Sequence, residues 1–275
     1  MGRLEGRVAL VSGSGRGIGR AVAMRLAREG AAVVVNDLDD APGHEVVEAI
    51  RAAGGRASAC IGDVGAKDFA ERFVGAAIGE FGGLDIIVNN AGYTWDAVIQ
   101  KMSDEQFDAI LDVHLKAPFR ILRAASEYIR VTAKAESQTG APRCRKVVNI
   151  SSIAGLYGNA GQANYAAAKA GIVGLTRTMA KEWGRYNVTV NCVAFGLIAT
   201  RLTQQLGEEG AAITVGGRDI SVGLHERTLA GIRATIPLGR EGTPDEAASA
   251  VYMLCSPDSD YVSGQVLEVT GGVRF

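Results

Sequence analysis

Cysteine is scarce in this chain of 275 residues, and its four cysteines lie far apart, at positions 60, 144, 192 and 255. They form no CxxC pair and none stands close to a histidine, so we expect no bound metal. The same scattering argues against a disulfide framework and favours the reducing cytosol. The sequence also lacks apolar runs of the roughly 18 residues that a membrane helix needs. Its first residues, MGRLEGRVAL, lack the apolar core of a signal peptide, and we expect a cytoplasmic protein.

An excess of charge of either sign is also missing. The chain carries 29 Lys and Arg against 30 Asp and Glu, a formal net charge of −1. Binding to nucleic acid or to a membrane surface usually requires a basic excess, so we expect neither partner. Glycine, by contrast, is abundant, and its 36 residues predict many tight turns.

Short apolar segments alternate with segments of helical periodicity along the chain. The apolar segments do not alternate with polar residues, so both faces of their sheet should be covered by helices. This pattern predicts a single domain, 1–275, of the α/β class, with a doubly wound, mostly parallel sheet of Rossmann type. The expected helices include 18–30, 44–55 and 69–83, and the seven expected strands are 7–13, 31–37, 57–64, 84–92, 146–152, 187–196 and 263–272.

Two segments interrupt this alternation. Residues 131–145 are polar, and we expect them to extend a helix end and continue as a surface connection to the next strand. Residues 198–239 form a long connection that leaves the carboxyl end of a strand, which is the edge where ligands bind in open α/β sheets. We expect a substrate lid in this second segment.

A glycine-rich turn, SGSGRGIG at 12–19, lies between the first expected strand and the first expected helix. Gly13, Gly17 and Gly19 can leave room for a pyrophosphate to approach the backbone amides at the helix N-terminus. Their spacing is GxxxGxG rather than the strict GxGxxG, but a turn between strand and helix is the context that a dinucleotide site requires. We therefore predict nucleotide binding at this turn.

The residue that ends the second strand bears on which nucleotide binds. Asp37 follows Gly13 by 24 residues, close to the ~20 expected for a carboxylate on the adenosine ribose, unless it only caps a helix. Such an anion repels a 2′-phosphate and the next residue, Leu38, is not basic, so NAD is favoured over NADP. Arg16, inside the glycine turn, could instead reach a 2′-phosphate, which leaves NADP open. Asp63, after the third strand, could contact the adenine edge or serve in a turn.

Several motifs in order resemble the short-chain dehydrogenase/reductase family over essentially the whole chain. The tract GNAGQANYAAAKAG at 158–171 is closely similar to 3-oxoacyl carrier-protein reductases. VVVNDL at 33–38 and VHL at 113–115 are more similar to the 3-hydroxyacyl-CoA dehydrogenase part of the β-oxidation multifunctional enzyme. The resemblance implies hydride transfer between a nicotinamide cofactor and a secondary alcohol or ketone. The other matching segments are SGSGRGIG, DV at 63–64, NNAG at 89–92, NISS at 149–152, YAAAK at 165–169, NCVAFG at 191–196 and SGQVLEVTGG at 263–272.

Tyr165 and Lys169 stand four residues apart, so they share one face of a helix. A free phenol has a pKa near ~10 and is a poor base at neutral pH, and making it an effective base needs roughly 3–4 kcal/mol of phenolate stabilisation. The Lys169 ammonium and the positive nicotinamide ring could supply it. We expect Tyr165 to exchange the proton, Ser152 to hydrogen-bond the substrate oxygen, and Lys169 also to hold the nicotinamide ribose.

The resemblance extends the set of cofactor contacts. It places Asn90 in a structural element near the adenosine side, and it implies that Ile198 and Thr200 face the nicotinamide amide. Gln162 could touch the substrate or serve only in a turn. The full set expected to bind the cofactor is Gly13, Arg16, Gly17, Ile18, Gly19, Asp37, Asp63, Val64, Asn90, Ala91, Gly92, Tyr165, Lys169, Ile198 and Thr200.

Two positions depart from the family pattern. His114 stands where the family usually has an asparagine that holds a water in a proton relay. With a pKa near ~6.5, an imidazole could relay protons itself, which makes His114 a catalytic candidate, or it could only cap a helix bend through a ring hydrogen bond. Phe195 precedes Gly196 where Pro-Gly is usual, so it could loosen the nicotinamide side or wall off the substrate pocket. Cys192 has no neighbour in the sequence that would activate a thiol, and we expect it in the core.

Three functions remain open. The first is an oxidoreductase of 3-hydroxyacyl/3-oxoacyl thioesters, with Arg201, Arg218 and Arg227 as candidates for a basic patch that meets a carrier protein or the phosphates of CoA. The second applies the same chemistry to a steroid, sugar or other small secondary alcohol, selected by the unusual lid segment 204–226. The third is a non-catalytic regulator that binds NADH, against which the intact Ser–Tyr–Lys set counts. The resemblance further implies a homotetramer or homodimer joined by the last two helices and the C-terminal strand.

Overall fold

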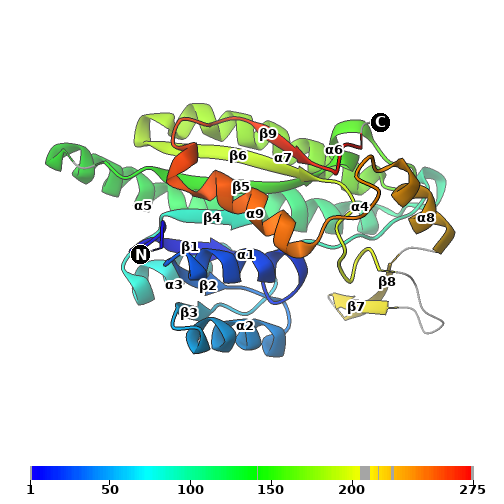
Figure 1. Ribbon diagram of the computed structural model, residues 1–275, viewed down its shortest axis with the longest axis horizontal. Coiled ribbons are helices and arrows are strands. Elements are labelled where there is room, and N and C mark those ends of the chain that lie inside the picture. Colours follow the sequence, from blue (N-terminus) through cyan, green and yellow to red (C-terminus); the bar gives the residue numbers. More distant parts are fainter. Residues whose placement is uncertain (1, 141, 205–210, 216, 224–225, 274–275) are drawn as a thin grey trace.

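The computed structural model describes residues 2–140, 142–204, 211–215, 217–223 and 226–273. It contains a seven-stranded sheet in which every pair of neighbouring strands is parallel (Figure 1). Across the sheet the order is β3 (Arg56–Ala59), β2 (Ala32–Val35), β1 (Val8–Val11), β4 (Ile86–Asn89), β5 (Arg145–Ser152), β6 (Val188–Phe195) and β9 (Val266–Val269). The predicted single-domain, doubly wound α/β fold is confirmed.

Helices follow most strands and cover both faces of the sheet, as the continuous apolar strands require. Within the described residues they are α1 (Gly17–Arg28), α2 (Asp40–Ala52), α3 (Phe69–Phe81), α4 (Asp104–Leu111), α5 (Ala117–Thr139), α6 (Ile153–Tyr157), α7 (Ala163–Trp183), α8 (Glu226–Thr235) and α9 (Pro244–Cys255). One hydrophobic cluster joins the sheet to α1, α2 and α9. A second joins the opposite face to α3, α5 and the end of α7.

Several strands are shorter than the apolar runs that predict them. The run 57–64 yields only the four residues of β3, and the first two strands end at Val11 and Val35. Gly13 and Asp37 therefore lie in turns beyond the paired backbone. The apolar pattern cannot locate these ends, because buried turn residues continue the run after strand pairing has stopped.

The strand order reverses between β1 and β4, so the loops that follow them diverge at the carboxyl edge of the sheet, where open α/β sheets bind their ligands. The expected lid, 198–239, also lies at this end (Figure 1). It holds α8 and an antiparallel hairpin of β7 (Ala211–Val215) and β8 (Arg218–Val222), which the sequence pattern did not predict. Residues 205–210, 216 and 224–225 of this segment lie outside the described residues.

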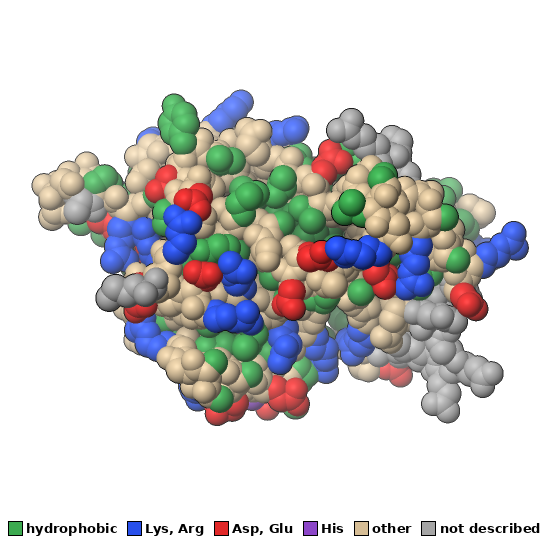
Figure 2. Space-filling model, viewed as in Figure 1, with side chains coloured by type: hydrophobic (Ala, Val, Ile, Leu, Met, Phe, Trp, Pro, Cys, Tyr) green, Lys and Arg blue, Asp and Glu red, His purple; other side chains and the backbone are tan. Residues whose placement is uncertain are grey.

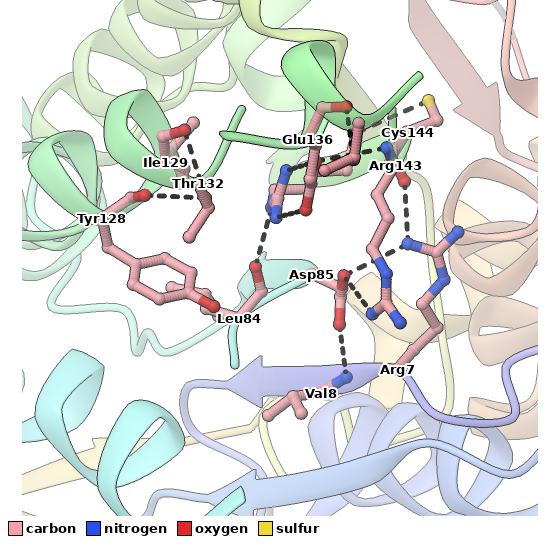
Figure 3. Close-up of polar contacts among 12 residues, drawn as sticks. Arg7, Val8, Leu84, Asp85, Tyr128, Ile129, Thr132, Glu136, Arg143 and Cys144 are labelled. Atoms are coloured by element: carbon pink, nitrogen blue, oxygen red, sulfur yellow. Dashed lines mark hydrogen bonds and ion pairs between the residues drawn. The ribbon is translucent and has the colours of Figure 1, made fainter. Parts of the chain in front are cut away.

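At the opposite edge of the sheet, α5 continues to Thr139, so most of the expected connection 131–145 is helical. A network of charged side chains attaches it to the strands (Figure 3). Arg145 forms two hydrogen bonds with the Glu136 carboxylate, at 2.9 and 2.6 Å. Asp85 accepts hydrogen bonds from Arg7 at 3.1 Å, from Arg143 at 3.4 Å and from the backbone N–H of Val8 at 3.0 Å.

Asp85→Ala is expected to lower the free energy of unfolding by about 1–3 kcal/mol, because it leaves the buried Val8 N–H without its acceptor and removes the carboxylate that pairs with Arg7 and Arg143. Urea denaturation followed by circular dichroism measures the change. The control is Glu127→Ala, which removes only a surface pair with Arg130 and should change stability little. Equal effects of the two substitutions would contradict the structural role of Asp85.

Acidic and basic side chains are interspersed on the face drawn in Figure 2, as the balanced composition suggests. Among the described helices, none combines the length and the apolarity needed to cross a membrane. Within the same part of the chain, no group of three His, Cys, Asp or Glu side chains is placed to hold a metal ion.

Candidate active site

The glycine turn between β1 and α1 is closed by close backbone approaches. Gly13 has φ 61°, and a Cβ there would lie 2.6 Å from Cα of Ala91. A Cβ on Gly19 would collide with the carbonyl oxygen of Gly13. Asn90 donates hydrogen bonds from Nδ2 to the carbonyls of Ser12 and Gly13, at 3.0 and 2.9 Å. Residues 90 and 91 therefore fix the turn. A pyrophosphate needs a cradle of backbone amides without side chains in its way, and this turn provides one.

Asp37 lies against this turn and is largely buried. Its Oδ2 accepts a hydrogen bond from the backbone N–H of Gly15 at 3.1 Å, and a Cβ on Gly15 would lie only 2.5 Å from that oxygen. Only a residue without a Cβ leaves room for the Asp37 carboxylate at position 15, and the sequence reasoning did not identify Gly15 in this role. Arg16 Nη1 lies 3.6 Å from Asp37 Oδ1 and 2.7 Å from Asp39 Oδ2, so two carboxylates already meet its charge.

Four further residues expected to bind the cofactor take three kinds of place. Thr200 lies over the glycine turn, with its methyl carbon 3.6 Å from the position of a Cβ on Gly17. Val64 and Ile198 have buried side chains that pack in the two core clusters. Asp63 is exposed and accepts a hydrogen bond from the backbone N–H of Gly65 at 2.8 Å, as a turn residue does.

The structure brings Ser152, Tyr165 and Lys169 together at the same edge of the sheet. Ser152 ends β5 and caps α6, while Tyr165 and Lys169 occupy one face of α7. Lys169 Nζ lies 5.6 Å from the centroid of the Tyr165 ring. It donates a hydrogen bond to the carbonyl oxygen of Ile150 at 2.7 Å, which directs the ammonium back toward the sheet.

Burial dominates the electrostatics of this group. Together with the smaller effect of the negative charge of Asp96, it raises the pKa of Tyr165 to about 12, against the hydrogen bond with Ser152. Burial also lowers the pKa of Lys169 to about 8. The sequence suggested that Lys169 and the positive nicotinamide ring together would lower the phenol pKa, and that combination stays a prediction. Positive charge brought by a ligand would add to that of Lys169 in stabilising the phenolate.

His114 contacts this group from the opposite side. It lies in a π-helical turn, η2 (Asp112–Lys116), between α4 and α5, and its ring meets the Tyr165 ring edge-on at a centroid distance of 5.0 Å. Nε2 lies 2.7 Å from the carbonyl oxygen of Tyr93, which assigns the hydrogen to Nε2 in the neutral ring. Nδ1 has no hydrogen-bond partner among the described residues. Gly92 is required beside it, because a Cβ there would collide with the ring.

Burial, followed by the charge of Lys169, holds the pKa of His114 well below its usual range. The unfolded chain takes up a proton near pH ~6.5 and the folded chain does not, so stability should fall as pH drops below that value, by up to ~1.4 kcal/mol per pH unit. We expect His114→Asn to reduce the loss of stability between pH 7.5 and 5.5 in urea denaturation. A loss as large as that of the unsubstituted protein would show that other groups cause it.

Two features of the site escaped the sequence reasoning. Asn164, fully buried beside Tyr165, donates to the carbonyls of Trp95 and Gln106 at 3.0 and 3.1 Å, and its Oδ1 accepts from the N–H of Tyr165 at 2.8 Å. A polar residue next to Tyr165 in an alanine-rich helix was the signal that could have revealed it. The second feature is the contact of segment 198–239 with the loop after β4: Tyr93 and Trp95 pack against a hairpin cluster of Ile213, Ile220 and Val222.

The other singled-out residues take simpler places. Phe195 is buried in the cluster of α1 and α9, so it fills the core rather than forming a pocket wall. Cys192 is fully buried, as expected, and burial raises the pKa of its thiol to about 11. Gln162 donates a hydrogen bond to Asp96 at 2.7 Å. Arg201 and Arg227 are exposed, while the side chain of Arg218 lies outside the described residues.

Comparison with known proteins agrees with this geometry. Residues 13–274 match the family model described as Enoyl-(Acyl carrier protein) reductase. The chain is 36% identical over 271 residues to the 3-oxoacyl-[acyl-carrier-protein] reductase FabG of Thermotoga maritima, covering 98% of this chain and 99% of that protein. It is 37% identical over 269 residues to the (2S)-[(R)-hydroxy(phenyl)methyl]succinyl-CoA dehydrogenase subunit BbsD of Thauera aromatica, covering 98% and 97%.

Among solved structures, a dehydrogenase/reductase from Sinorhizobium meliloti 1021 matches with a TM-score of 0.82 at 31% identity, covering 98% of this chain and 95% of that one. The range matched by the family model, 13–274, includes Gly13, Gly17 and Gly19, the Ser–Tyr–Lys group and β9. The chain therefore belongs to the short-chain dehydrogenase/reductase family and is a nicotinamide-dependent oxidoreductase.

Proposed function

We propose that this enzyme interconverts 3-oxoacyl and 3-hydroxyacyl thioesters with NADH and NAD⁺. The observation that carries the proposal is the meeting of Ser152, Tyr165 and Lys169 beside the glycine turn, at the edge of the sheet where ligands bind. The printed names of two relatives, a 3-oxoacyl carrier-protein reductase and an acyl-CoA dehydrogenase subunit, support a thioester substrate.

Ser152, Tyr165 and Lys169 would each have a distinct role in the reaction. A bound nicotinamide supplies or accepts the hydride. In reduction, Ser152 Oγ donates a hydrogen bond to the substrate carbonyl oxygen, and the Tyr165 hydroxyl transfers its proton to that oxygen. Lys169 stabilises the phenolate that remains. In the reverse direction, Tyr165 takes the alcohol proton.

His114 is assigned to positioning in this proposal. Its Nε2–H is held by the carbonyl of Tyr93, and its ring packs edge-on against Tyr165. This arrangement supports the interpretation of a histidine that stabilises a helix bend, here a π-helical turn, over the proton relay.

NAD is the proposed cofactor. The glycine turn and the N-terminus of α1 would hold its pyrophosphate, and Asp37 its adenosine ribose. The buried carboxylate of Asp37 disfavours a 2′-phosphate at that position, and Arg16 is already paired with Asp37 and Asp39.

The segment 198–239 is the proposed substrate lid. Its hairpin packs on Tyr93 and Trp95, which lie just after β4 and next to the catalytic helix. Selection of the acyl group would take place between this hairpin and the site. A steroid, sugar or other small alcohol remains the second candidate substrate, because the lid segment is unusual and substrate specificity would depend on it.

Initial rates of NADH oxidation with acetoacetyl-CoA, a keto sugar and a keto steroid test the proposal. We expect acetoacetyl-CoA to give the highest kcat/KM. Turnover of only the sugar or the steroid would transfer the proposal to the second candidate. Tight NADH binding without turnover of any ketone would favour the non-catalytic regulator.

Assembly as a homotetramer or homodimer stays a prediction, as does a cytoplasmic location. Exposed apolar side chains on and after α9 support assembly through this region: Met253, Tyr261 and Val262.

A further inference from the structure

A carboxylate that the sequence reasoning did not single out lies against the start of α7, the helix that carries the proposed catalytic tyrosine. Asp96 follows β4, and its Oδ2 accepts a hydrogen bond from Nε2 of Gln162 at 2.7 Å. The other end of the Gln162 amide accepts a hydrogen bond from Asn159 at 2.9 Å, which fixes its orientation. Gln162 is the residue before α7 and precedes Tyr165 by three positions. The carboxylate is therefore fixed beside the turn of helix that carries the phenol.

The backbone on both sides of Asp96 is also attached to this helix end. The N–H of Ala97 donates to the carbonyl oxygen of Gly161 at 2.9 Å, and Ala97 forms a parallel bridge with Gln162. The carbonyl of Trp95 accepts the hydrogen bond from Asn164 at 3.0 Å. The loop that carries Asp96 is therefore fixed to the start of α7 on both sides of this residue.

The groups that face Tyr165 are few. His114 approaches from η2 as a neutral ring, Ser152 from β5 as a hydroxyl, and Lys169 from α7 as the cation. Among the described groups that affect the pKa of Tyr165, Asp96 is the one that carries a negative charge. One side of Asp96 is exposed, yet the protein atoms around its other side desolvate it and raise its pKa, against the hydrogen bond from Gln162. Because solvent screens its charge in part, we expect a modest effect.

We propose that Asp96 is a positioning and specificity residue, whose fixed negative charge disfavours a second anion beside Tyr165. That second anion is either the phenolate of the resting enzyme or a carboxylate that the acyl chain of the substrate carries within a few bonds of its reacting carbon. The inference rests on the proposed function, and it narrows the substrate class to acyl thioesters that are uncharged around the ketone. Like charges brought together at a site commonly provide this kind of discrimination.

Asp96→Asn keeps the shape and an acceptor for Gln162 but removes the charge. In alcohol oxidation, where Tyr165 must lose its proton, we expect the rising limb of the pH profile of kcat/KM to move to lower pH by ~0.5–1 unit. We also expect the ratio of kcat/KM for 3-oxoadipyl-CoA to that for acetoacetyl-CoA to rise roughly tenfold. Asp96→Glu should restore both values toward those of the unsubstituted enzyme. Asp245→Asn, an exposed carboxylate of α9, should leave both unchanged.

A readout without turnover separates this inference from the proposed function. The NMR chemical shift of Tyr165 Cζ, assigned by comparison with Tyr165→Phe, reports ionisation of the phenol as pH rises. We expect ionisation to begin at lower pH in Asp96→Asn than in the unsubstituted protein, whatever the substrate. The same onset in both proteins, or an unchanged pH profile and substrate ratio, would overturn the role of Asp96. Failure of every thioester with a shifted onset would instead overturn only the substrate assignment.

Discussion

Tyr165→Phe is expected to lower kcat for ketone reduction by roughly 10²–10⁴-fold, the range by which a positioned acid or base accelerates proton transfer. The substitution removes only the hydroxyl oxygen, and the ring remains to pack against His114. Binding of NADH should therefore be nearly unchanged, so that the loss falls on kcat. Steady-state kinetics together with a fluorescence titration of NADH separate the two.

A matched substitution makes this prediction specific. Tyr186→Phe removes a phenolic oxygen at the other end of α7, in the short 3₁₀ turn Gly184–Tyr186, and should retain full activity. If Tyr165→Phe retained more than about a tenth of the rate, well above the range for losing an acid or base, the proton would have to come from another group.

Asp37→Asn is expected to lower the preference for NADH over NADPH by at least roughly tenfold in kcat/KM. A like charge next to a 2′-phosphate costs several kcal/mol, and about 1.4 kcal/mol corresponds to a factor of ten. Asparagine keeps an acceptor for the N–H of Gly15, so the glycine turn should be preserved. Kinetics with each cofactor at saturating ketone give the ratio.

Arg16→Ala supplies the opposite arm of this experiment. If Arg16 is occupied by Asp37 and Asp39, as its distances of 3.6 and 2.7 Å indicate, its removal should change the use of NADH little. If the unsubstituted enzyme preferred NADPH and the Arg16→Ala variant did not, this result would contradict the role given to Asp37. Arg16 would then be the residue that recognises the 2′-phosphate.

The sequence predicted the fold well because hydrophobic periodicity reports burial directly. Continuous apolar runs such as 31–37 mark strands covered on both faces, and the structure confirms the parallel sheet that they predict. Strand ends were located less well, because turn residues such as Asp37 are also buried. The hairpin of β7 and β8 escaped prediction because its buried side chains pack on Tyr93 and Trp95, which are distant in sequence.

The candidate site divides in the same way. The spacing of Tyr165 and Lys169 is a local property of a helix, and the structure places them on one face. The contacts of Asp96 and Asn164 depend on which loop lies against the first turn of α7, and no local pattern reports that. The sequence shows the lysine near Tyr165 but not the burial that raises the pKa of the phenol, because burial depends on which segments pack around the ring.

Transfer of deuterium tests the central claim most directly. The enzyme is incubated with acetoacetyl-CoA and with NADH in which deuterium replaces both hydrogens on C4 of the nicotinamide. The product is analysed by mass spectrometry. We expect 3-hydroxybutyryl-CoA with one deuterium at C3, formed by the unsubstituted enzyme and by Tyr186→Phe but almost absent with Tyr165→Phe. NADH that binds without labelling this product, or labelling that persists undiminished in Tyr165→Phe, would contradict it.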